Sequence, residues 1–170
     1  MLRTIALLTA APVMLGAAAA QEFTPYLEVG PGFALEQNFD TVGVTARGGV
    51  RTPMRDIIDA LAFEGELFYG LDGEDNGPVE AKIEYSLSAS VRPIIEVAPN
   101  FDLFARAGVD ISKAEVEGQG FFAGGAEDTE VGLLVGAGGE FRLTPRTGLR
   151  FDYSHRNDYD MVQATYAVRF

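Results

Sequence analysis

The stretch that decides the fold is Val79 to Arg92, VEAKIEYSLSASVR. Every odd-numbered position from Val79 to Val91 is apolar, and every even-numbered position from Glu80 to Arg92 is polar. Because successive side chains of a β-strand point to opposite faces, this alternation predicts a strand with one apolar face and one polar face.

Seven further segments alternate in the same way, and turn-rich stretches separate them. They are Tyr26 to Ala34, Val42 to Arg51, Leu61 to Leu71, Phe101 to Ile111, Glu130 to Arg142, Thr147 to His155 and Met161 to Phe170. In the first of them, Pro31 predicts a bulge or a local break. Repeated alternating segments of about ten residues are typical of membrane strands. The sequence therefore predicts an all-β protein, an eight-stranded antiparallel up-and-down transmembrane β-barrel.

The first twenty residues have the composition of a secretory signal. Arg3 precedes an apolar run from Ile5 to Leu15, and small residues stand at 18–20. We expect cleavage after Ala20, which leaves residues 21–170 as a single barrel domain; the alternative is an uncleaved anchor helix. No later segment has the roughly 18 consecutive apolar residues of a membrane helix, and the absence of cysteine excludes disulfides and thiolate chemistry.

The polar faces of the predicted strands carry nearly balanced charge. Their nine acids and eight bases are Glu28, Glu64, Glu66, Glu80, Glu84, Asp102, Asp110, Glu140, Asp152, Arg47, Arg51, Lys82, Arg92, Arg106, Arg142, Arg150 and Arg169. The opposite faces carry no charge apart from His155. Since charges inside a narrow barrel must be paired, we expect structural ion pairs in the lumen. A soluble sandwich or lipocalin, the alternative, would turn these charges to water instead.

The connections are of two kinds. Those at 52–60, 93–100 and 144–147 contain proline and are predicted to be periplasmic, whereas 35–41, 72–78, 112–129 and 156–160 are predicted to be external.

The predicted external loops are strongly acidic. Their charged residues are twelve acids, Glu36, Asp40, Asp72, Glu74, Asp75, Glu115, Glu117, Glu127, Asp128, Glu130, Asp158 and Asp160, against Lys113 and Arg156. Such a field repels nucleic acid and favours divalent cations or basic external proteins as partners. Phe121 and Phe122 in the third loop either contact a partner or lipid, or fold onto the barrel rim.

The end of the chain carries a family resemblance. Tyr166, Val168 and the carboxy-terminal Phe170 resemble the β-signal that the barrel-assembly machinery recognises, and Leu149 to His155 with the last strand resembles the final hairpin of OmpA/OmpX-type and opacity-type barrels. The resemblance implies a Gram-negative outer-membrane protein with membrane lipids and the assembly machinery as partners. Because the sequence ends at Phe170, we expect a barrel alone, without the peptidoglycan-binding domain that follows the barrel in full-length OmpA proteins.

Residues suited to catalysis are scarce. Ser154 and His155 are the only candidates for a lipid A hydrolase, but adjacent strand residues point to opposite faces and cannot act as nucleophile and base without a bulge. Asp72, Glu74 and Asp75 lack the full spacing of a calcium loop. We therefore expect no catalytic, metal or cofactor site. The sequence favours a non-enzymatic barrel for envelope integrity or surface interactions, with a narrow channel for ions or small solutes as the alternative.

Overall fold

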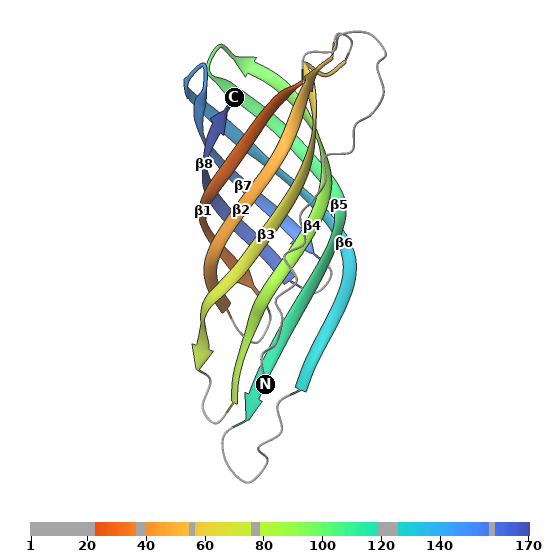
Figure 1. Cartoon of the computed structure of the whole chain (residues 1–170), viewed down its shortest axis with the longest axis vertical. Helices are drawn as coiled ribbons and strands as arrows, with labels where there is room; N and C mark the ends of the chain where they lie inside the picture. Colours follow the sequence, from red (N-terminus) through yellow and green to blue (C-terminus); the bar gives the residue numbers. More distant parts are fainter. Residues whose placement is uncertain (1–22, 37–39, 55–56, 76–78, 119–125, 157–158) are drawn as a thin grey trace, which may run out of the picture.

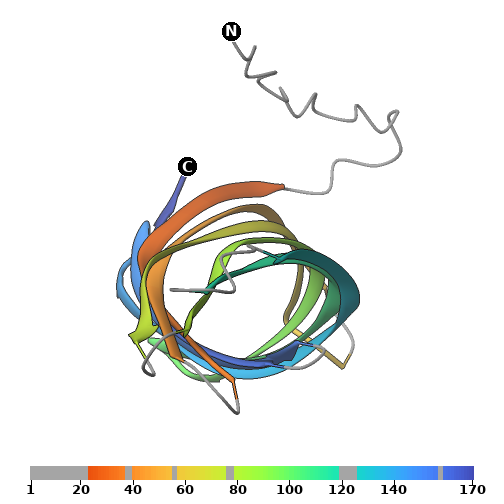
Figure 2. The ribbon, with the colours of Figure 1, turned by 90° about the horizontal axis from the view of Figure 1, so that it is seen from below.

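A closed barrel forms the whole of the described structure (Figures 1 and 2). The computed structural model describes residues 23–36, 40–54, 57–75, 79–118, 126–156 and 159–170, with side chains except at 73–75, 79–82, 114–118 and 126–128. Each strand pairs antiparallel with its neighbour in the chain, and the first strand also pairs with the last. The predicted eight-stranded up-and-down barrel is confirmed.

The strands differ in length. Their bounds are β1 Thr24–Leu35, β2 Asp40–Pro53, β3 Ala60–Asp75, β4 Val79–Ala98, β5 Phe101–Gly118, β6 Ala126–Thr144, β7 Thr147–Arg156 and β8 Tyr159–Arg169. The connections at 54–59, 99–100 and 145–146 lie at one end of the barrel, together with the start of β1 and the end of β8. We call this end the turn end. The other end, with connections at 36–39, 76–78, 119–125 and 157–158, is the loop end. Strands β3 to β6 have 16 to 20 residues and project beyond the others at the loop end (Figure 1).

Two predicted connections are shorter than expected. The predicted connection from Pro93 to Asn100 begins too early, because β4 continues to Ala98 and only 99–100 connect it to β5. Pro93 pairs with Leu61 of β3 but has no partner in β5. A proline that interrupts only one of its two ladders does not end a strand. At the loop end, β5 and β6 extend into the long loop predicted at 112–129, which leaves 119–125 as the connection.

Pro31 has the same effect in β1. Pairing with β8 stops after Val29 and resumes at Gly32, while Pro31 still pairs with Val44 of β2. The register is the same on both sides of the gap, so the proline causes a local break and no bulge.

The strands are staggered around the barrel. Following register partners from Pro25 of β1 leads through Val50, Phe63, Val91, Ala107, Val135, His155 and Asp160 back to β1 at Leu35. The circuit returns ten residues further along β1. A stagger of this kind requires strongly tilted strands, about 40° from the barrel axis.

A bulge changes the direction of one predicted face. The β4–β5 register shifts between Ile83 and Tyr85. Ile83, predicted to face outward, is therefore buried inside the barrel, and Glu84, predicted to face inward, lies half-exposed at the rim. The extra residue of a bulge reverses the alternation on one side of it.

The outer wall is apolar. Its exposed side chains include Leu27, Leu67, Leu87, Leu103 and Val135, and the aromatic residues Phe63, Tyr69, Phe151 and Tyr153 lie among them. The charged side chains at the centre of the polar faces are buried inside. The soluble alternative is thus wrong, because it requires the reverse arrangement. Within the described residues, no helix has the length and apolarity needed to cross a membrane.

We predict that Gly138→Ala destabilises the barrel. A Cβ there would lie 2.3 Å from the backbone oxygen of Phe151 and 2.6 Å from Cζ of Phe104. The free energy of unfolding should fall by about 1–3 kcal/mol, measured by urea unfolding in detergent micelles. Gly65→Ala is the matched control, since a Cβ at Gly65 meets nothing within 4 Å. Equal stabilities of the two variants would contradict this packing.

Candidate functional site

The lumen is the most highly organised polar region of the described structure. Its fully buried charged residues are Arg47, Arg92, Arg106, Arg150, Arg156, Glu28, Glu64, Glu66, Asp102, Asp110, Glu140 and Asp152. The alternation of each strand turns these side chains inward. With Gln163 of β8, every strand contributes a polar side chain to the interior.

Arg47 of β2 joins four strands. Its Nη1 donates to Glu28 at 2.6 Å and its Nε to Glu66 at 2.8 Å. Its Nη2 donates to Oε1 of Gln163 at 2.8 Å and lies 3.4 Å from a carboxylate oxygen of Asp152. The guanidinium therefore has acceptors for its fork of donors, which is the condition for burying such a charge.

Arg106 and Arg150 bind three of the same acceptors as Arg47, and Arg150 also binds Glu64. Nη1 of Arg106 donates to Glu66 at 2.9 Å and to Asp152 at 3.1 Å. Nη1 of Arg150 donates to Glu64 at 2.7 Å and to Glu28 at 3.2 Å. Each of these carboxylates pairs with more than one arginine, and the ion pairs therefore form a continuous network.

The network meets an apolar layer on its turn-end side. The layer consists of the buried residues Tyr26, Ala60, Ala62, Ile94 and Phe104. The guanidinium carbons of Arg150 and Arg92 lie 4.3 Å and 4.9 Å from the centre of the Phe104 ring, and Arg92 also lies 2.6 Å from Glu64. Cation–π contacts of this kind allow an aromatic layer to pack directly on charged groups.

The loop-end side has its own apolar layer. Ala34, Phe68, Ile83, Tyr159 and Met161 form it, and all are buried. The hydroxyl of Tyr159 donates to Asp110 at 3.0 Å and so links this layer to the charges below it. The central ion pairs are therefore enclosed between two apolar layers.

Arg156 is a lumen residue that the sequence reasoning missed. The sequence predicts it in an external loop, but it ends β7 and is fully buried. It pairs with Glu66 and lies 3.2 Å from Asp110, while its Nε donates to Ser154. The alternation of the strand indicates the inward direction of Arg156, because Asp152, Ser154 and Arg156 are alternate positions on one face.

The remaining predicted inner residues lie near the two rims. At the turn end, Arg51 and Arg142 pair with Asp102, and Arg169 pairs with Glu140. At the loop end, Glu84 pairs with Lys113 at 3.0 Å. Lys113 lies within β5 and not in a loop. The side chains of Glu80 and Lys82 lie outside the described residues.

The predicted assembly signal lies on the outer side of β8. Tyr166 and Phe170 are exposed and Val168 is partly exposed. Phe121 and Phe122 lie outside the described residues.

The structure separates the two candidates for a hydrolase. Ser154 is buried in the lumen against Arg156, whereas His155 lies on the outer wall and bonds to Asp160 at 2.8 Å. The barrel wall lies between nucleophile and base. In the part of the chain that the structure describes, no group of three or more His, Cys, Asp or Glu side chains is placed to hold a metal ion.

We predict that Arg47→Met destabilises the barrel far more than Arg146→Met, a matched change in an exposed turn. Removing one partner of a buried ion pair costs about 3–5 kcal/mol, whereas a surface change costs less than about 0.5 kcal/mol. Arg47→Lys should fall between the two, because lysine keeps the charge but loses the planar fork of donors. Urea unfolding in detergent micelles measures all three, and a lysine variant as stable as the parent would show that charge alone is needed.

Comparisons with known proteins agree with this architecture. The crystal structure of Ail, the attachment invasion locus protein of Yersinia pestis, in complex with the heparin analogue sucrose octasulfate has a TM-score of 0.58 at 15% identity and covers 88% of this chain and 99% of its own. Neisserial surface protein A has a TM-score of 0.54 at 16% identity, and the match covers 86% of this chain and 95% of its own. The N-terminal β-barrel domain of Pseudomonas aeruginosa OprF has a TM-score of 0.50 at 13% identity, and the match covers 85% of this chain and 97% of that domain. These likenesses show the fold.

No curated protein matches the sequence. The sequence profile of the outer membrane protein beta-barrel domain, however, matches residues 4–170, nearly the whole chain. This match agrees with the apolar wall and with the charges enclosed in the lumen. The chain belongs to the outer membrane protein beta-barrel domain family.

Proposed function

We propose that this protein is a closed, non-enzymatic barrel that contributes to envelope integrity or to surface contacts through an acidic external end. In this proposal residues 1–20 are a cleaved signal, the turn end faces the periplasm and the loop end faces the outside. The observation that carries the proposal is the arginine–carboxylate network that joins all the central positions of the lumen.

The network argues against a channel. Arg47 and Arg106 are only 1% and 2% exposed, and both bind Glu66 of β3 and Asp152 of β7, strands on opposite sides of the closed barrel. A conducting path would require these pairs to separate and their charges to be hydrated. The apolar layers on both sides add a second barrier to water and ions.

The loop end has the features of a contact surface. Strands β3 to β6 project there as a four-stranded sheet, and exposed acids of the described residues include Asp40, Asp72 and Glu130. Because Arg156 turns inward, this surface has less positive charge than the sequence reasoning assigned to it. An acidic surface attracts cationic partners and repels polyanions.

The charge also separates this chain from one of its structural neighbours. Ail was crystallised with a heparin analogue, which is a polyanion. The acids at the loop end favour the opposite class of ligand, a basic protein or a divalent cation. Shared fold therefore gives no reason to assign the same ligand.

The closed-lumen proposal is tested in planar bilayers. We expect the reconstituted protein to give no stable conductance at neutral pH. The channel alternative predicts steady openings that change in Arg106→Met or Glu64→Gln and do not change in Leu67→Ala, which alters only the outer wall. That pattern would overturn the proposal.

The acidic-surface proposal is tested by binding of the barrel in nanodiscs to immobilised polylysine and heparin. We expect binding to polylysine that weakens as salt is raised, and no binding to heparin. The triple variant Asp40→Asn, Asp72→Asn and Glu130→Gln should bind polylysine several-fold more weakly. Arg146→Gln at the turn end is the control: it removes a positive charge and should not weaken binding, and a several-fold weakening there would refute a specific role of the loop end.

A further inference from the structure

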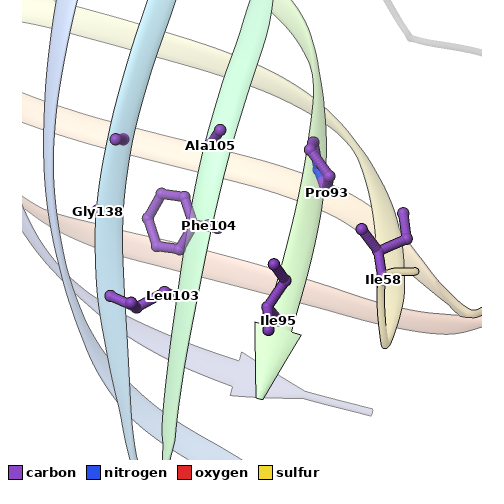
Figure 3. A pocket seen from close by; sticks show the side chains of 8 residues that line it. Ile58, Pro93, Ile95, Leu103, Phe104, Ala105 and Gly138 are labelled. Carbon is purple, nitrogen blue, oxygen red and sulfur yellow. The ribbon is translucent and has the colours of Figure 1, made fainter. Parts of the chain in front are cut away.

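Three arginines line the inner side of the wall near the turn end, and we call the place between them the turn-end mouth. They are Arg51 of β2, Arg142 of β6 and Arg169 of β8. On their loop-end side lies the apolar layer of Phe104, whose ring occupies the space beside Gly138 (Figure 3). Because this layer limits how far a ligand can enter, a ligand at the mouth binds near the rim.

The acids that hold these arginines are more deeply buried than the arginines. Asp102 and Glu140 are register partners in β5 and β6, and their side chains are 0% and 2% exposed. Nη1 of Arg51 donates to Asp102 at 3.1 Å, and Nη2 of Arg142 lies 3.3 Å from the same carboxylate. Arg169 pairs with Glu140. The arginine side chains are 17%, 23% and 11% exposed in chain order, so a ligand meets guanidinium groups first.

Arg169 is incompletely neutralised by its acid. Glu140 also accepts a hydrogen bond from Nη1 of Arg92 at 3.5 Å, so it is shared between two arginines. Nη1 of Arg169 is buried and has no hydrogen-bond acceptor among the described residues. Arg51 lies within electrostatic range of Arg169, on the other side of β1, and is a like charge. An anion between the two would accept from the buried donor and reduce the repulsion.

The third arginine has an exposed acid beside it. Oε1 of Glu96 lies 2.9 Å from Nη2 of Arg142, and the Glu96 side chain is 42% exposed. Glu96 is the register partner of Asp102 and therefore lies on the inner side of the wall. Because Glu96 neutralises Arg142, Arg51 and Arg169 are the stronger anion-binding pair.

We propose that the turn-end mouth binds the phosphate group of a soluble compound between Arg51 and Arg169. Guanidinium forks bind phosphate through paired hydrogen bonds. A phosphate group has three acceptor oxygens and a charge of about −1.5 to −2, which suits two arginines better than a single carboxylate does. Both arginines face the lumen, whereas lipid headgroups contact the outer wall. That this compound comes from the periplasm rests on the orientation proposed above.

An NMR titration with inorganic phosphate tests the proposal, on the protein in micelles of an uncharged detergent. We expect saturable shifts of the guanidinium Nε–H signals of Arg51 and Arg169. Arg51→Gln and Arg169→Gln should each weaken phosphate binding by about fivefold or more, because one of the two forks is lost. Arg146→Gln removes an exposed arginine in a turn at the same end and should leave binding unchanged. Heat-modifiable gel migration checks that each variant is folded.

Glu96→Gln tests the effect of charge in the opposite direction. It should strengthen phosphate binding by about twofold or more, because an exposed acid of the mouth is removed. The proposal is overturned if no saturable shift occurs, if Arg146→Gln weakens binding as much as Arg51→Gln, or if Glu96→Gln weakens binding.

Phosphatidylglycerol added to the same micelles, in place of inorganic phosphate, tests the alternative source of a phosphate group. We expect no shift of the Arg51 and Arg169 signals. A shift equal to that with inorganic phosphate would assign the site to a lipid headgroup and overturn the soluble ligand. Neither the conductance nor the polylysine experiment measures phosphate at this mouth, so failure of the inference leaves those results intact.

Discussion

The pairing of buried arginines with carboxylates is the constraint on which the rest of the structure depends. A lumen bounded by eight strands is only wide enough for side chains, so charges placed there lose most of their water. Arg47 alone contacts Glu28, Glu66, Asp152 and Gln163, which come from four different strands. Such a centre fixes the register of every strand that supplies a partner, because a slip of one residue would turn that partner to the lipid.

Small residues make this arrangement possible. A Cβ at Gly43 would meet the Phe68 ring at 2.6 Å, and a Cβ at Gly138 would meet the Phe104 ring at the same distance. Each apolar layer therefore depends on a strand position without a side chain, opposite a large ring. The apolar layers and the ion pairs lie at different levels along the barrel axis. Aromatic rings enclose the charges and contact them directly, as Arg92 and Arg150 do on Phe104.

Alternation in the sequence is enough to predict the eight strands, because period two is a property of each segment alone. It also turns Glu64 and Arg106 to the inside, where the structure has them. It does not determine which charges meet, since that depends on the stagger of strands distant in sequence. The exceptions have local causes: a bulge reverses the face of Ile83, and Arg156 follows the parity of β7 past its expected end. Pro93 shows that a proline that interrupts only one of its two ladders does not end a strand.

The division of charge along the barrel connects the fold with the proposed role. In the lumen, arginine and carboxylate are nearly balanced because an unpaired charge there would be costly. At the loop end no such limit applies, and the negative charge of the chain can accumulate where water and ions screen it. A sequence that only had to fill a barrel would not need this excess. Because the excess lies on the projecting strands and their connections, changes there can alter surface binding without disturbing the network that holds the barrel together.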